Sequence, residues 1–126
     1  MASRRDPVHL SGAEWKVMHC VWEADTATAR DVRDALVDDT DWAYTTVKTM
    51  MTRLVDKGAL WARMRGNTTH FTPRITQEDA RHSAVRALMD RAFDGTAGSL
   101  LHFLVEGRKL SRKERAALRD LLEGER

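Results

Sequence analysis

Residues 43–73 read AYTTVKTMMTRLVDKGALWARMRGNTTHFTP, and two structural patterns meet in this segment. Its first half repeats apolar residues at spacings of three and four, which is typical of one face of a helix. We expect this helix to run from about Ala43 to Lys57, because Gly58 interrupts the pattern. Its predicted buried face consists of Val47, Met50, Met51 and Leu54.

The second half of the stretch alternates with a period of two, which is typical of a β-strand. Gly66-Asn67 is a hairpin-turn signal, and Pro73 ends the β-rich run that follows it. A β-hairpin is therefore predicted directly after the helix. In its first strand, Leu60, Ala62 and Met64 alternate with Trp61, Arg63 and Arg65.

Two further helices are predicted before this stretch. The first begins with a capping-box pattern at Ser11 and Glu14, and the second begins in the same way at Thr28 and Asp31. Three helices followed by a basic hairpin form a winged helix-turn-helix, in which the third helix enters the major groove of DNA. The predicted buried residues are Trp15, Met18 and Trp22 in the first helix, and Ala29, Val32, Ala35 and Leu36 in the second.

The C-terminal part of the chain is again predicted to be helical, so the fold class is mostly α. We assign residues 1–75 to a winged-helix DNA-binding domain and residues 76–126 to a helical dimerisation domain. The three C-terminal helices are expected from Thr76 to about Phe93, from Ser99 to Glu106 and after Ser111.

These short helices carry more apolar surface than one compact unit would hide, and such a surface usually marks an interface. A twofold homodimer would cover it and would suit a protein that binds a palindromic site. The alternative is a packed monomer of six helices. The candidate dimer-interface residues are Leu88, Leu100, Leu101, Phe103, Leu104, Leu118, Leu121 and Leu122.

Charge is concentrated in one part of the chain. The formal net charge is only +2, yet residues 43–75 carry six basic side chains and one acidic side chain. Residues 1–42 carry five basic and nine acidic side chains. A basic segment favours a polyanionic partner such as nucleic acid, although a solvated surface face could have the same composition.

The predicted helix over residues 43–57 presents short hydroxyls and long cations with almost no acid on its exposed face. Threonine binds phosphates or base edges, and basic side chains bind phosphates. Double-stranded DNA is therefore the expected partner. The candidate DNA-binding residues are Thr45, Thr46, Lys48, Thr49, Arg53, Arg63 and Arg65.

Several other classes are excluded by the 126-residue composition. No apolar run approaches the length of a membrane span, and the N-terminus has no hydrophobic signal core, so we expect a cytoplasmic protein. The single cysteine, Cys20, excludes an internal disulfide framework and a cysteine-built zinc site. The five histidines are scattered and no catalytic motif is present, so we expect no enzyme activity, no cofactor and no metal site.

Three alternatives stay open at this point. Cys20 could have a redox role, and histidines could hold a metal across a dimer. A winged helix could also serve protein–protein contact without sequence-specific DNA binding. The basic segment over residues 43–75 argues against that last alternative, because a protein-binding winged helix needs no cationic third helix.

Several motifs also carry a family resemblance, and they follow one another along nearly the whole chain. The chain resembles the BlaI/MecI family of penicillinase and methicillin-resistance repressors, to which the copper repressor CopY is related. This resemblance implies a homodimeric transcriptional repressor whose winged helix binds an inverted repeat in a promoter, with Thr46 and Thr49 facing the groove. The motifs are LSGAEWKVMHCVW over residues 10–22, DW at 41–42, TVKT at 46–49, RLVDKGAL at 53–60 and FTP at 71–73.

The resemblance also implies a route of induction. In penicillin-responsive members a membrane sensor metalloprotease system triggers cutting of the repressor in a dimer helix, commonly at an Asn-Phe bond. The equivalent bond here is His102–Phe103, of which Phe103 matches and His102 departs. The wing tip departs as well, because members often have Gly-Arg where this chain has Gly66-Asn67, so we expect a different operator sequence.

Overall fold

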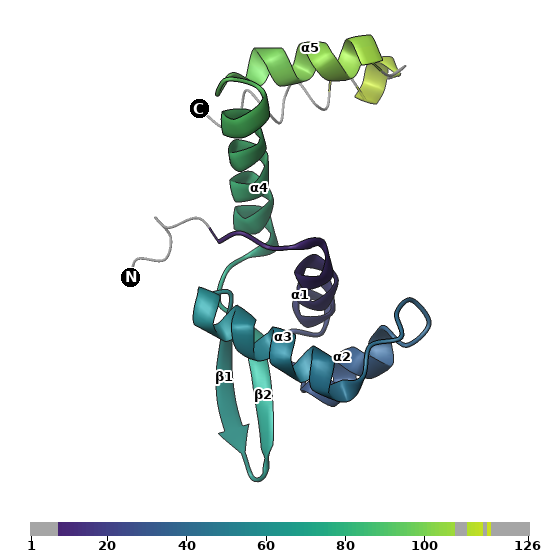
Figure 1. The fold of residues 1–126 in the computed structure, drawn as a ribbon, viewed down its shortest axis with the longest axis vertical. Coiled ribbons are helices and arrows are strands. Elements are labelled where there is room, and N and C mark those ends of the chain that lie inside the picture. The colour runs from purple at the N-terminus through teal and green to yellow at the C-terminus, as the bar shows by residue number, and fades with distance from the viewer. Residues whose placement is uncertain (1–7, 108–110, 115, 117–126) are drawn as a thin grey trace. The chain divides into compact units, whose positions relative to one another are not determined.

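The computed structural model describes residues 8–107, 111–114 and 116. The chain divides into two compact units, residues 1–83 and residues 84–126. The first unit contains three helices and a hairpin, and Figure 1 shows their order along the chain. Helix α4 (Gln77–Ala92) begins in the first unit and continues into the second.

The three N-terminal helices begin where the sequence predicted. Helix α1 (Gly12–Ala24) has the predicted capping box: the Glu14 amide donates to Ser11 Oγ at 3.2 Å, and the Ser11 amide donates to Glu14 Oε1 at 2.9 Å. Helix α2 (Ala29–Ala35) has the same reciprocal pair between Thr28 and Asp31. Side-chain caps of this kind satisfy amides that have no partner within the helix.

Helix α3 (Tyr44–Lys57) ends at Gly58, whose φ of 89° lies in the left-handed region that favours glycine. Strands β1 (Leu60–Arg65) and β2 (Thr68–Pro73) then form the predicted antiparallel hairpin, which we call the wing. Gly66, with a φ of 65°, lies at its turn. Three helices and this wing make the first unit a winged helix-turn-helix (Figure 1), as predicted.

The base of the wing is fastened to the segment between α1 and α2. The Phe71 amide donates to the Ala27 carbonyl at 2.8 Å, and the Ala27 amide donates to the Phe71 carbonyl at 3.0 Å. Both residues are buried. This isolated bridge fixes β2 beside the helices, which positions the rest of the wing.

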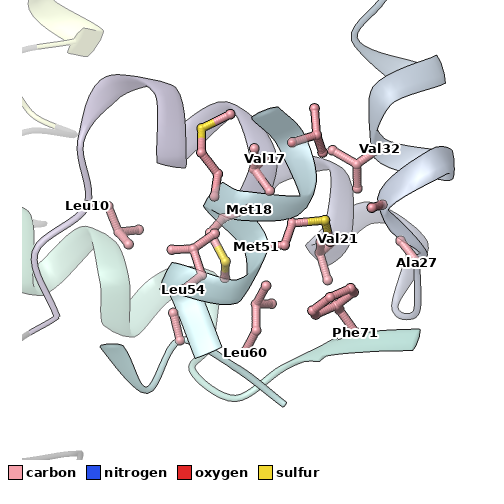
Figure 2. Close-up of a cluster of buried hydrophobic side chains, with 14 of the residues drawn as sticks. Leu10, Val17, Met18, Val21, Ala27, Val32, Met51, Leu54, Leu60 and Phe71 are labelled. Carbon is pink, nitrogen blue, oxygen red and sulfur yellow. The ribbon is translucent and has the colours of Figure 1, made fainter. Parts of the chain in front are cut away.

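The core of the first unit lies between α1, α2, α3 and the base of the wing (Figure 2). The predicted buried face of α3 is confirmed, because Val47, Met51 and Leu54 are fully buried and Met50 nearly so. The predicted stripe of α1 is wrong in part. Of its three residues only Met18 is fully buried, and it packs beside Val17 and Val21 instead of the two tryptophans.

Trp15 and Trp22 lie half-buried at the edge of the core, with ring centroids 5.9 Å apart, and the His19 ring contacts both at centroid distances of 5.8 Å. The indole nitrogen of Trp22 donates to the Ile75 carbonyl at 2.9 Å, and this polar group keeps the ring near the surface. The slimmer valines fit the narrow space against α3 that the tryptophans were expected to occupy.

One other burial prediction is wrong. Ala35 is exposed, because α2 ends at this residue and the core contact passes to Leu36. Ala62 and Met64 are also exposed, since beyond Leu60 the wing extends past the helices that would cover it. Beyond Leu60, the alternating side chains of β1 therefore lie on two faces of the wing that are both exposed to solvent.

In the second unit, α5 (Ala97–Gly107) includes the predicted helix from Ser99 to Glu106. The Ser99 amide donates to Thr96 Oγ1 at 3.3 Å, so Thr96 caps its start. The rings of Phe93 and Phe103 contact each other with centroids 5.5 Å apart. Among the described residues of this unit, Leu100 is the buried hydrophobic side chain.

Candidate nucleic-acid interface

The exposed face of α3 carries the predicted DNA-binding residues of that helix. All five are exposed, while the opposite face of the helix forms the core. The face offers hydroxyl and cationic side chains, with no acidic residue in the first turn of the helix. Such a surface can donate hydrogen bonds to an anion without first displacing a carboxylate. Its residues are Thr45, Thr46, Lys48, Thr49 and Arg53.

The N-terminal end of α3 adds to this positive surface. Its N-cap residue is Ala43, which has no side chain able to cap the helix. The first amides of a helix point outward and carry the positive end of the helix dipole. The end of α3 therefore favours negative charge at the same place as Thr45 and Thr46.

One cation of the basic segment is used for folding instead. The Lys57 ammonium donates to Glu14 Oε1 at 2.6 Å and to the His9 carbonyl at 2.9 Å. Burial alone would raise the pKa of Glu14, but hydrogen bonds from Lys57 and Ser11 and the charge of Lys57 outweigh it and hold the pKa below its usual value. This pair ties the end of α3 to the start of α1.

A concavity of about 400 Å³ lies where the starts of α2 and α3 meet the wing tip. Arg30 of α2 lies over the ring of Tyr44 of α3, with its guanidinium carbon 5.8 Å from the ring centroid. The lining contains two cations and no carboxylate. It consists of Thr28, Ala29, Arg30, Tyr44, Lys48, Asn67, Thr68, Thr69 and Phe71.

The predicted wing residues Arg63 and Arg65 lie on the other face of the hairpin. They line a second concavity of about 420 Å³ together with Trp61, His70 and Thr72. Arg63 is the cross-strand partner of His70, whose Nδ1 is buried without a hydrogen-bond partner among the described residues. The structure thus divides the predicted contacts into a group on α3 and a group on the wing.

A further cation of the basic segment, Arg74, directly follows the hairpin. Arg74 lies over the indole ring of Trp61, with its guanidinium carbon 4.1 Å from the ring centroid. Trp61 is 53% exposed, so this tryptophan lies outside the core. A stacked arginine of this kind is held in a restricted orientation.

Sequence reasoning missed Arg30 and Tyr44. Arg30 lies in the net-acidic part of the chain, outside the basic segment that guided the prediction. Tyr44 was assigned no role, although it is the first residue of α3. The signal that would have found both is their position at the first turns of consecutive helices, where the ends of a helix-turn-helix converge.

The predicted dimer residues in the second unit differ in exposure. Leu88 is 46% exposed and Phe103 is 59% exposed, whereas Leu100 is buried within the chain. Leu101 and Leu104 are half-buried, and His102 of the predicted cleavage bond is exposed. Leu118, Leu121 and Leu122 lie outside the described residues.

Within the described ranges, no three His, Cys, Asp or Glu side chains gather where they could hold a metal ion. No helix in the part of the chain that the structure describes is both long and apolar enough to span a membrane. Cys20 is half-buried, and this burial, with the charge of Glu23, raises the pKa of its thiol. A raised pKa lowers the thiolate fraction and so disfavours a reactive cysteine.

Comparison with known proteins agrees with this architecture. The penicillinase repressor of Bacillus licheniformis is 30% identical over 114 residues, which cover 90% of this chain and 89% of that protein. The solution structure of the DNA-binding domain of the repressor BlaI has 31% identity and a TM-score of 0.53, covering 59% of this chain and 90% of that domain.

A second solved structure contains DNA. It is the monomeric form of B. licheniformis BlaI in complex with the blaP half-operator, with 31% identity and a TM-score of 0.51. It covers 59% of this chain and 90% of that chain. The sequence profile described as penicillinase repressor matches residues 10–124, nearly the whole length of the sequence. The chain therefore belongs to the penicillinase repressor family.

Proposed function

We propose that this protein is a DNA-binding transcriptional repressor that binds an inverted-repeat operator as a homodimer. Residues 1–75 would bind DNA, and residues 76–126 would hold two chains together. The observation that carries the proposal is the exposed face of α3, which presents hydroxyls and cations, has no acidic residue in its first turn and carries Asp56 near its end. The half-operator complex of the related BlaI supports DNA as the partner.

In this mechanism α3 enters the major groove. Thr46 and Thr49 would contact base edges or thymine methyl groups, and Lys48 and Arg53 would contact phosphates. Thr45, at the first turn of α3, lies where the helix dipole favours a phosphate. A dimer would place two such helices in successive major grooves and block the promoter to RNA polymerase.

The wing supplies the second group of contacts. Arg63 and Arg65 are exposed and belong to the wing face that turns away from Phe71 and the core. Their long side chains can reach the phosphate backbone flanking the groove that α3 occupies. These contacts carry charge but no base information, so they would add affinity for all DNA.

Selection of bound duplexes from a random DNA pool by the purified full chain tests the proposal. We expect an enriched inverted repeat with two half-sites about one helical turn apart, or a multiple of it. If the dimer neutralises about 8–10 phosphates, raising salt from about 50 to 200 mM should weaken binding by ~10³–10⁵. A folded protein that enriches no sequence would instead support a winged helix used for protein–protein contact.

Two sets of variants separate the two groups of contacts. Arg63→Ala with Arg65→Ala should weaken binding to operator and to random DNA by the same factor, because phosphates are common to both. Thr46→Ala should reduce the affinity for the operator more than the affinity for random DNA. Equal losses for Thr46→Ala on both DNAs would contradict groove reading by this residue.

The same proposal includes inactivation by proteolysis at the His102–Phe103 bond on an antibiotic or cell-wall signal, through a membrane sensor metalloprotease system. Both residues are exposed on α5, in the unit proposed to hold the dimer. Mass spectrometry of the repressor recovered from β-lactam-treated cells tests this part. A fragment ending at His102 is expected, and an intact chain during full induction would contradict it.

A further inference from the structure

We propose that Arg30, Tyr44 and Lys48 form a binding site for one phosphodiester of the DNA backbone in each half-site. The inference rests on the proposed function and adds to it a contact from α2. The site is the concavity of about 400 Å³ at the starts of α2 and α3. A phosphate bound there would be held from two helices at once.

The first argument is the way Arg30 is held. Its guanidinium lies 5.8 Å from the centroid of the Tyr44 ring, and Tyr44 is 39% exposed beside the mouth of the concavity. A cation over an aromatic face is attracted to it, which restricts the long side chain before any ligand arrives. A guanidinium held in one orientation loses less freedom when it donates to an anion.

The second argument is charge. Among the described residues, Arg30 and Lys48 form no ion pair with a carboxylate. The acid next to Arg30, Asp31, accepts from the Thr28 amide in the capping box. Two cations from different helices thus face one concavity whose lining carries no acid, which leaves their charge available to an anion.

The third argument is position. Tyr44 is the first residue of α3 and directly precedes Thr45, while Asn67 of the wing turn lines the same concavity. With α3 in the major groove, the strand that borders the groove passes between the start of the recognition helix and the wing. A phosphodiester carries one negative charge and two free oxygens, which suits the paired donors of Arg30 together with Lys48.

Substitution of Arg30 gives the first test. Arg30→Ala in the full chain should weaken binding to operator and to random DNA alike, by about tenfold. The slope of log affinity against log salt should fall by about 0.9 per half-site, the value for one phosphate contact. Arg33→Ala is the matched control, because Arg33 lies on the same helix, pairs with Asp34 at 3.0 Å and does not line the concavity.

A neutral methylphosphonate, placed at each backbone position of one half-site in turn, identifies the phosphate. With the unmodified protein, one position should weaken binding about as much as Arg30→Ala does. With Arg30→Ala, that same position should cost less than in the unmodified protein, because only the contact from Lys48 is left to lose. Tyr44→Leu, which removes the ring under the guanidinium, should reproduce part of the loss, whereas Tyr44→Phe should reproduce less of it.

The outcomes separate this inference from the proposed function. If the unmodified protein binds no DNA, both fail. If it binds its operator and Arg30→Ala binds equally well with an unchanged salt slope, only the inference is wrong. Saturable binding of inorganic phosphate at Arg30, without any change in DNA affinity for Arg30→Ala, would overturn it in favour of a free anion. Arg30→Gln serves as the second variant if the alanine variant does not fold.

Discussion

The two units of the chain bury their apolar side chains to very different degrees. In the first unit, sixteen buried hydrophobic residues form one continuous cluster that spans α1 to the start of α4 (Figure 2). In the described part of the second unit, Leu100 is buried, while Leu88 and Phe103 expose about half of their surface. The first unit thus forms a core within one chain, whereas the described part of the second unit buries one hydrophobic side chain and leaves Leu88 and Phe103 exposed.

This difference predicts that substitutions in the two units have different consequences. A core substitution in the first unit should lower the free energy of unfolding. An apolar substitution in the second unit should act mainly on association. All four tryptophans lie in the first unit, so their fluorescence reports its unfolding separately.

The largest effect is expected for Leu54→Ala. Leu54 is fully buried in the first core, and removing its side chain leaves a cavity that the packed neighbours cannot close. We expect the free energy of unfolding to fall by about 3 kcal/mol in urea titrations followed by tryptophan fluorescence. Thr52→Ala, at an exposed position of the same helix, should change it by less than about 0.5 kcal/mol.

Phe103→Ala tests the other unit. Removing this exposed ring should raise the dimer dissociation constant about 30-fold, or about 2 kcal/mol, if Phe103 anchors the interface. Sedimentation over a concentration series measures the constant. An unchanged dimer dissociation constant would contradict the comparison. So would a loss in the free energy of unfolding of the first unit as large as that of Leu54→Ala.

Glu14→Gln probes the charged side chain that is buried among the described residues of the first unit. The pKa of Glu14 is lowered in the folded chain, so its carboxylate stabilises the fold above the usual value near 4.5, and this contribution is lost as pH falls through the folded pKa. We expect Glu14→Gln to cost about 1–2 kcal/mol at neutral pH. The difference between the two proteins should shrink as pH falls below 4.5 and through the folded pKa, and a difference that stays constant throughout acid titration would contradict the assignment.

The smallest effect is expected for Gly58→Ala. A Cβ at this position would meet no atom within 4 Å, so the cost comes from the φ of 89° alone. The left-handed conformation should cost about 1 kcal/mol for alanine. Gly12→Ala is the control, because Gly12 lies in the first turn of α1 without a positive φ and should lose no stability.

The parts of the fold that local chemistry determines were predictable from the sequence. The caps at Ser11 and Thr28, the stop at Gly58 and the turn at Gly66 each depend on residues within a few positions of one another. A single segment is sufficient to identify such features. This is why the order of helices and wing followed from the sequence alone.

Features that depend on what packs against an element were harder to predict. Trp15 and Val17 both fit a helical apolar stripe, and the choice between them depends on the shape of α3. The exposure of Met64 depends on how far the wing extends beyond its neighbours. Arg30 of α2 contacts Tyr44 of α3, and a contact between two helices leaves no sequence pattern within either helix.

The bridge between Ala27 and Phe71 also has a consequence for how such a protein can change over generations. Since the wing is anchored at its base, the stretch from Ala62 to Thr69 contributes no fully buried side chain to the fold. Substitutions there can change the charge of the wing while the core that folds the domain is left intact. The proposed affinity of the wing for the DNA backbone can therefore be adjusted at its tip, one tolerated replacement after another, without a loss of foldability along the way.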